Sequence, residues 1–174
     1  KPMIAWAIEI AKASKQFDHI IVSSDDAEII SIANEYGASA PFIRPSHLSD
    51  DLSPTVPVIA HAVEECNRIG LAAKYVCCIY PGVPFMQADD LTGAYNLLKS
   101  TNSDFVYPVT EYPHPTQRAM RKLTNNKMQF IDSTCEMKRT QDLEPLFHDA
   151  GQFYWGKASA WTDKKKMHSD GIGM

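Results

Sequence analysis

The stretch Lys74–Tyr80, KYVCCIY, is a continuous apolar run that Pro81-Gly82-Val83-Pro84 ends abruptly. Such a run is typical of a β-strand that is covered on both faces. Helical periodicity lies on either side of it, in Val56–Val63 and in Gln87–Ser100. Shorter strand-like runs occur at the following ranges: His19–Ser23, Ser39–Ile43, Asp104–Pro108 and Gln152–Trp155. The alternation of strand and helix predicts an α/β fold with a mostly parallel sheet and right-handed crossovers.

The ends of the chain carry weaker signals. After Pro2, apolar residues recur at helical spacing as far as Ala11, and Trp6 on that face is expected in the core. A second helix follows Ser24-Asp25-Asp26 and should stop at Gly37. Ala158–Thr162 is predicted as a short helical turn, and residues 164–174 have no periodicity and are expected to form a tail.

The range 110–149 has no long amphipathic helix, so we expect a single domain over residues 1–174 with an insertion at 110–149. Within the insertion, Arg118–Leu123 and Met128–Ile131 flank a polar turn and predict a β-hairpin. Because the insertion has little apolar patterning of its own, we expect it to pack against a partner.

Composition excludes several classes of protein. Of the 174 residues, 44% are hydrophobic and 22% charged, as in ordinary globular domains. The net charge of −4 gives no basic field for nucleic acid or an anionic membrane. No apolar run is long enough to span a membrane, and no signal peptide opens the chain. Four cysteines without a C-x-x-C pair predict reduced thiols in a cytoplasmic protein, and the histidines have no metal spacing.

The loop Phe42–Thr55, FIRPSHLSDDLSPT, is the first candidate site. It carries the cation Arg44, two adjacent carboxylates and several hydroxyls at a point where a strand ends and a helix begins. This placement suits a phosphate-bearing ligand, although a solvated connection capped by Asp and Ser has the same composition.

Three further segments could carry chemistry. Ser24-Asp25-Asp26 follows a strand end and is either a helix cap or a ligand contact, and Tyr80-Pro81 ends the most apolar strand. Arg139–Leu143, RTQDL, suits a carboxylate-bearing sugar or is a surface ion pair. His148-Asp149 could form a catalytic dyad, but neighbours in a strand face apart.

Seven segments together resemble the acylneuraminate cytidylyltransferases, in particular the branch that makes CMP-pseudaminic acid. In chain order they are KPMIAW, IIVSSDDAEII, ANEYGA, IRPSHLSDD, CCIYP, RTQDL and HDAGQFYWGKA. Tyr80 stands where the sialic-acid branch usually has Gln before the proline, and HDAG stands where that branch has an Asn-Gly step. Both departures favour the pseudaminic branch.

The resemblance implies a nucleotide-diphospho-sugar transferase fold, Rossmann-like, that dimerises through its hairpin insertion. It implies transfer of CMP from CTP to the anomeric hydroxyl of a nonulosonic acid, with release of pyrophosphate and with Mg²⁺ as cofactor. The nucleotide would contact Arg44, Leu52, Ser53 and Thr55, with Ser24 and Asp25 nearby. The sugar would contact the following residues: Tyr80, Pro81, Arg139, Gln141 and Tyr154.

Two parts of the family pattern have no counterpart here: a Gly/Ser/Arg/Lys-rich phosphate loop before the KPM step, and a downstream Asp-x-Asp that binds metal. We therefore expect a chain that is incomplete at both ends, without metal ligands, and inactive by itself. The residues leave open a catalytically silent nucleotide- or sugar-binding protein, a CMP-N-acetylneuraminic acid synthetase, and a nucleotidyltransferase for other sugars.

Overall fold

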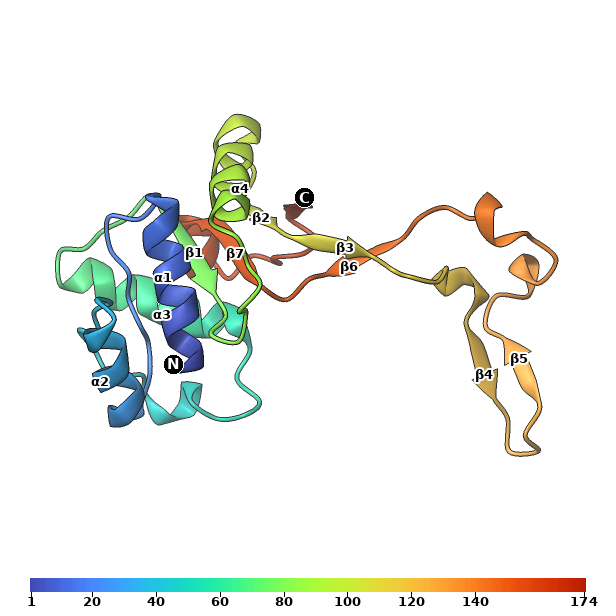
Figure 1. The fold of residues 1–174 in the computed structure, drawn as a ribbon, viewed down its shortest axis with the longest axis horizontal. Helices are drawn as coiled ribbons and strands as arrows, with labels where there is room; N and C mark the ends of the chain where they lie inside the picture. The colour runs from blue at the N-terminus through green and yellow to red at the C-terminus, as the bar shows by residue number, and fades with distance from the viewer. The chain divides into compact units, whose positions relative to one another are not determined.

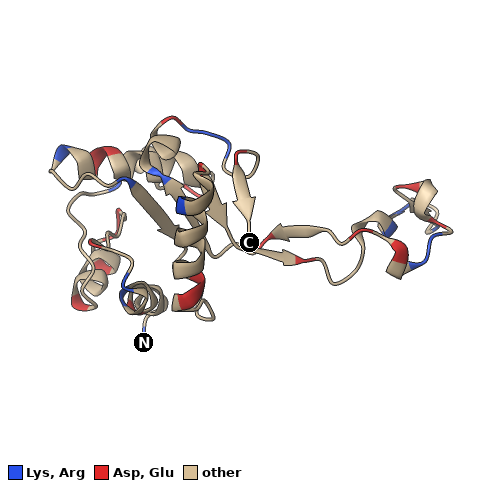
Figure 2. Cartoon of the chain, turned by 90° about the horizontal axis from the view of Figure 1, so that it is seen from above, with Lys and Arg blue, Asp and Glu red and all other residues tan.

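A computed structural model describes all 174 residues, which form two compact units (Figure 1). Unit 1 comprises Lys1–Pro108 and Gly151–Met174, and unit 2 comprises Val109–Ala150. No helix is both long enough and apolar enough to cross a membrane. Basic and acidic residues are interspersed along the chain (Figure 2), in keeping with its net charge of −4.

Unit 1 contains five α-helices, all of which the sequence pattern predicted. They are α1 (Met3–Ser14), α2 (Ala27–Glu35), α3 (Thr55–Arg68), α4 (Ala88–Thr101) and α5 (Ala158–Thr162). Asp26 caps α2 by accepting hydrogen bonds from the backbone N–H groups of Glu28 and Ile29. Gly37 follows α2 with a φ of 82°, which ends the helix in the left-handed region as predicted.

A four-stranded sheet forms the centre of unit 1, in the order β1-β7-β2-β8. Its strands are β1 (Tyr75–Ile79), β7 (Phe153–Lys157), β2 (Phe105–Tyr107) and β8 (Gly171–Gly173). β7 is antiparallel to β1 and to β2, whereas β2 and β8 are parallel. The α/β class is confirmed, but pairing within this sheet is mixed, because the late strand β7 inserts between β1 and β2.

Two predictions about strands were wrong. His19–Ser23 and Ser39–Ile43 form no ladder and meet only in a parallel bridge between Ile21 and Ser39. Two backbone hydrogen bonds, Val22 N–H to Ser39 O and Ser39 N–H to Ile20 O, are too few for a strand pair. Conversely, residues 164–174 are not simply a tail: β8 pairs with β2, an interaction between distant segments that local periodicity cannot reveal.

Side chains on the two faces of the sheet pack against different helices. Phe153, Trp155 and Val106 face α1 and α4, and the Trp155 indole N–H donates to Leu91 O at 3.0 Å. On the opposite face, the ring of Phe105 meets Trp161 of α5 edge-on, with centroids 4.9 Å apart. Phe105 and Val106, neighbours in β2, thus point to opposite faces of the sheet and contribute to both halves of the core.

Trp6 was predicted to be buried, and this is wrong. It is 43% exposed, because the small side chains of Ala5, Ala7 and Ala11 form the buried side of α1. The Lys1 ammonium lies over the Trp6 ring, 3.7 Å from its centroid.

Unit 2 is a set of two-stranded ribbons and short turns. β3 (Val109–Glu111) pairs with β6 (Phe147–Asp149), and the hairpin of β4 (Met120–Lys122) and β5 (Met128–Phe130) lies where it was predicted. The turns are η2 (Thr116–Arg118), η3 (Ser133–Cys135) and η4 (Thr140–Asp142). Cys135 is the one buried side chain of this unit.

Candidate functional site

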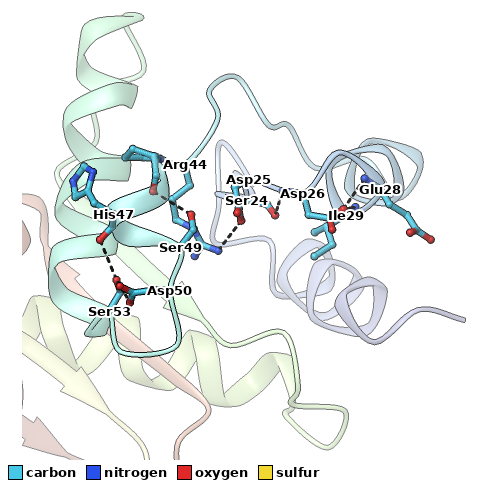
Figure 3. Close-up of polar contacts among 11 residues, drawn as sticks. Ser24, Asp25, Asp26, Glu28, Ile29, Arg44, His47, Ser49, Asp50 and Ser53 are labelled. Atoms are coloured by element: carbon cyan, nitrogen blue, oxygen red, sulfur yellow. Dashed lines mark hydrogen bonds and ion pairs between the residues drawn. The ribbon is translucent and has the colours of Figure 1, made fainter.

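Arg44 is held in place by three contacts with two neighbouring segments (Figure 3). Its backbone N–H donates to Ser24 O at 3.0 Å, and its Nε donates to Ser49 Oγ at 3.2 Å. Its Nη2 lies 3.5 Å from Asp25 Oδ1. The side chain is 25% exposed, so part of the guanidinium faces solvent. Because a guanidinium has five N–H donors, this arrangement leaves several of them for a ligand.

The local fold brings Asp25 and Arg44 together. The parallel bridge between Ile21 and Ser39 makes the two segments run in the same direction, so they emerge at the same edge. Ser24 O then accepts the hydrogen bond from Arg44 N–H. Asp26 caps α2, as one of the two sequence readings held, whereas Asp25 next to it pairs with the cation. The two carboxylates thus have separate tasks.

The loop around Asp50 is organised by its own hydroxyls and carboxylate. η1 (Ser46–Leu48) opens it, and Asp50 Oδ1 accepts from the Leu52 backbone N–H at 3.0 Å. Ser53 Oγ lies 2.8 Å from Asp50 Oδ1 and 3.3 Å from His47 O (Figure 3). The bonds from Ser53 and Leu52 hold the pKa of Asp50 below its usual value. The Leu52 side chain is 90% exposed.

Thr55 and Tyr80 connect this loop to the sheet. Thr55 begins α3 and Tyr80 directly follows β1, yet their hydroxyl oxygens are 2.6 Å apart. The Tyr80 backbone N–H donates to Gln152 O at 2.9 Å, and its ring lies 5.3 Å from that of Tyr154. Tyr154 is only 2% exposed. The structure therefore joins a predicted nucleotide residue directly to a predicted sugar residue, with Pro81 next in the chain.

The other predicted sugar residues, Arg139 and Gln141, belong to unit 2. Arg139 makes a bidentate pair with Asp142, with Nε and Nη2 at 2.7 and 2.9 Å from the carboxylate oxygens. The Arg139 side chain is 70% exposed, so within unit 2 it is a surface ion pair. A cavity of about 360 Å³ in the same unit is lined by the following residues: His114, Pro115, Thr116, Arg118, Ala119 and Thr140. Of the candidate segment Arg139–Leu143, only Thr140 lines this cavity.

Other titratable and thiol groups lie outside this cluster of polar contacts. His148 Nδ1 lies 2.9 Å from the backbone oxygen of Asp149, its neighbour in β6. The four cysteines form no disulfide, and burial raises the pKa of the Cys78 thiol to about 12. No three His, Cys, Asp or Glu side chains converge as metal ligands.

Sequence reasoning missed the partners that orient Arg44. Ser49 was noted only as one hydroxyl of the loop, and the pairing of Arg44 with Asp25 was not foreseen. The Asp-rich step after His19–Ser23 was the available signal, because consecutive strand ends of an α/β domain share an edge.

Helices on both faces of a central mixed sheet, with polar loops gathered around Arg44, define an α/β domain with a polar candidate site. Two solved structures share this fold. CMP:2-keto-3-deoxy-manno-octonic acid synthetase in complex with CTP matches 94% of this chain and 66% of its own, with a TM-score of 0.65 at 13% identity. The 4-diphosphocytidyl-2C-methyl-D-erythritol synthase of Anaerococcus prevotii matches 94% of this chain and 63% of its own, with a TM-score of 0.60 at 12% identity.

The chain belongs to the cytidylyltransferase family, whose model matches residues 1–166. It is 39% identical to the pseudaminic acid cytidylyltransferase of Campylobacter jejuni, over 97% of this chain and 74% of the relative. A Helicobacter pylori protein named for that activity and for a hydrolase activity is 35% identical, over 97% of this chain and 32% of its own. The N-acylneuraminate cytidylyltransferase of Oncorhynchus mykiss is 26% identical, over 88% of this chain and 34% of its own. The resemblance and the enzyme class predicted from the sequence are thereby confirmed.

Proposed function

We propose that this protein transfers CMP from CTP to the anomeric hydroxyl of a nonulosonic acid, and that pseudaminic acid is the preferred acceptor. The hydroxyl oxygen attacks the α-phosphorus, the bond to the bridging oxygen breaks, and pyrophosphate leaves while the hydroxyl proton passes to water. The activated sugar would serve glycosylation of the cell surface or of flagellin. The observation that carries the proposal is the 39% identity to a pseudaminic acid cytidylyltransferase along 97% of the chain.

Arg44 is the proposed reader of the cytosine ring. Cytosine presents two adjacent acceptors, O2 and N3, and a guanidinium fork can donate to both. The contacts of Arg44 with Ser49 and Asp25 fix the plane of this fork before the base arrives. Preorganisation of this kind lowers the entropy that binding costs.

The rest of the nucleotide pocket is proposed around the same loop. Leu52, with 90% of its side chain exposed, offers an apolar surface for the base or ribose. Ser53 and Thr55 would lie near the ribose, and Ser24 and Asp25 support the loop from behind. Since Ser53 is bound to Asp50, its contribution is to hold the loop closed as well as to meet the ligand.

The sugar site is proposed around Tyr80, Pro81 and Tyr154 of unit 1, and a partner copy is proposed to contribute Arg139 and Gln141. Tyr80 presents a half-buried ring, and the nearly buried Tyr154 supports it. A guanidinium such as that of Arg139 suits the carboxylate of a sugar acid. Pseudaminic acid ends in a deoxy methyl group, which an aromatic ring accommodates better than an amide does.

We further propose a homodimer in which unit 2 packs against a second copy. The side chains of Ile131, Met137 and Phe147 are 65%, 92% and 57% exposed, and unit 2 buries little of its own apolar surface. Apolar side chains that a unit does not bury itself can be buried against a second copy. The partner copy would then supply Arg139 and Gln141 to the sugar site.

Mg²⁺ is proposed as the counterion of the triphosphate, since it neutralises the phosphate charges in such transfers. The residues of this chain do not fit a dedicated metal site, because no three carboxylate, thiol or imidazole ligands converge. No step of the reaction is therefore assigned to a metal that these residues hold. Because the acceptor and CTP are both cytoplasmic metabolites, we place the activity in the cytoplasm.

The test is an acceptor panel with the full-length protein, CTP and Mg²⁺, followed by pyrophosphate release. Pseudaminic, legionaminic and N-acetylneuraminic acids would be compared with a blank without acceptor. We expect release that depends on the acceptor and is fastest with pseudaminic acid. Fastest release with N-acetylneuraminic acid would favour the CMP-N-acetylneuraminic acid synthetase instead. CTP binding with no release from any acceptor would favour a silent binding protein.

A further inference from the structure

The hydroxyl groups of Thr55 and Tyr80 form a direct hydrogen bond between the two halves of the proposed site. Thr55 is the first residue of α3, immediately after the loop that carries Arg44. Tyr80 lies at the end of β1, the strand that leads to the sugar side. Their oxygens are 2.6 Å apart, a normal length for an O–H···O bond, and the pair is partly buried.

The rest of Tyr80 is fixed, so the direction of this hydrogen bond is the part that can change. Its backbone N–H is bound to Gln152 O, and its ring rests edge-on against Tyr154. A hydroxyl proton, in contrast, rotates to suit its partner. The pair therefore has two states, in which either Thr55 or Tyr80 is the donor.

Each state presents different groups to ligands. When Thr55 donates to Tyr80, the Tyr80 proton is free to donate to a sugar oxygen, and Thr55 Oγ1 keeps lone pairs for a ribose hydroxyl proton. When Tyr80 donates to Thr55, the Tyr80 proton is occupied and the sugar side loses its donor. Hydrogen-bonded chains with one consistent direction strengthen each member.

We propose that Thr55 is a positioning residue that couples nucleotide binding to sugar binding through Tyr80. A ribose hydroxyl that donates to Thr55 sets the direction in which Thr55 donates to Tyr80 and Tyr80 donates to the sugar acid. Nucleotide and sugar then bind cooperatively, and the coupling is reciprocal. This inference rests on the proposed function, because it assigns the two ends of the pair to those two ligands.

The experiment measures the coupling itself by calorimetry on the full-length protein. The Kd of pseudaminic acid is determined alone and with saturating CMP, which cannot react. We expect the sugar to bind about threefold to tenfold more tightly with CMP, the scale of one hydrogen bond. We call the Kd without CMP divided by the Kd with CMP the coupling ratio. Thr55→Val, which removes the hydroxyl and keeps the branched shape, should bring this ratio to about one. Thr55→Ser should retain the ratio.

Two variants separate coupling from damage. Tyr80→Phe should bring the ratio to about one, as Thr55→Val does. The double variant should have no further effect, because both substitutions remove the same hydrogen bond. Thr92→Val, which deletes a hydroxyl bound only to Ala88 O within α4, should keep the wild-type ratio. A lost ratio in Thr92→Val would mean that unspecific destabilisation, and not the pair, controls it.

The outcomes distinguish the inference from the function on which it rests. Wild-type protein that binds neither CMP nor pseudaminic acid would overturn the proposed function. Wild-type protein that binds both with a ratio of one would overturn only the coupling. The coupling would also be overturned if Thr55→Val left the ratio unchanged, or if Thr55→Ser brought it to about one.

Discussion

Arg44 Nη2 lies 3.5 Å from Asp25 Oδ1, although the two residues are separated by the whole of α2. Both follow segments that meet only in a single parallel bridge. The pair orients a cation at the edge where the polar loops gather, and the proposed cytosine contact depends on this orientation. The proposed cytosine contact therefore depends most directly on Arg44.

Arg44→Lys should weaken CTP binding by about 1.5–3 kcal/mol, because an ammonium keeps the charge but loses the planar fork. Preference for CTP over UTP should fall as well. Calorimetric Kd values for both nucleotides measure the two effects. Arg68→Lys, which alters a guanidinium paired with Glu65 on α3, is the matched control and should leave both values unchanged. Equal affinities in wild type and Arg44→Lys would remove Arg44 from the base site.

Tyr80→Gln should narrow the preference for pseudaminic acid over N-acetylneuraminic acid by roughly one to two kcal/mol, because an amide suits a more polar sugar. The readout is the ratio of kcat/KM values for the two acceptors in parent and variant. An unchanged ratio would show that Tyr80 does not select the sugar.

Gly156→Ala should destabilise unit 1 by about 1–3 kcal/mol, because an added methyl group overfills a packed core. A Cβ at this position of β7 would lie 2.6 Å from Trp161 Nε1 and 2.7 Å from Phe105 Cδ1. Gly82→Ala is the control, since its Cβ would meet nothing within 4 Å. Urea unfolding compares the two, and equal midpoints would contradict the packing described for the α5 face.

Asp104→Asn should lower stability at neutral pH but not in acid. Lys165 and Lys157 bind the Asp104 carboxylate and lower its pKa from 3.8. A depressed pKa contributes stability above the unfolded value, and this contribution is lost as the pH falls through the folded value. The loss at neutral pH should be up to about 1 kcal/mol. It should vanish below the folded pKa.

Unfolding curves at several pH values test the Asp104 prediction. Glu64→Gln, which removes an exposed carboxylate without an ion pair, is the control and should be nearly neutral throughout. If Asp104→Asn is still less stable than the wild type in acid, the loss of stability comes from packing and not from charge.

Met137→Asp together with Phe147→Asp should shift the protein from dimer to monomer, because charges on the exposed apolar side chains of unit 2 oppose association. Sedimentation velocity at micromolar concentration measures the shift. Lys122→Asp, at an exposed polar position of β4, is the control for added charge. A wild-type protein that sediments as a monomer would refute the proposed assembly.

Local signals predicted the helices and the β4–β5 hairpin well, but two short strands and the pairing of strands poorly. The cap at Asp26, the stop at Gly37 and the hairpin of β4 and β5 are each encoded within a few residues. The insertion of β7 between β1 and β2 depends on contacts between distant segments, and so does the pairing of β8. No periodicity reports such contacts.

The candidate site divides in the same way. The polar composition of the Phe42–Thr55 loop indicated a candidate site, and Arg44 was the cation within it. The partner of Thr55 could not be foreseen, because the hydrogen bond to Tyr80 joins the start of a helix to the end of a strand. The prediction for Trp6 was wrong because Ile8 and smaller side chains, mainly alanines, form the buried side of α1.

The most direct test of the central claim follows the oxygen of the anomeric hydroxyl. Pseudaminic acid that carries a heavy oxygen isotope at this hydroxyl is incubated with CTP, Mg²⁺ and the full-length protein, and the product is analysed by mass spectrometry. Attack of the hydroxyl on the α-phosphorus predicts a CMP-sugar that retains the label in its carbon–oxygen–phosphorus bridge. A CMP-sugar without the label, or release of unlinked CMP alone, would contradict the account.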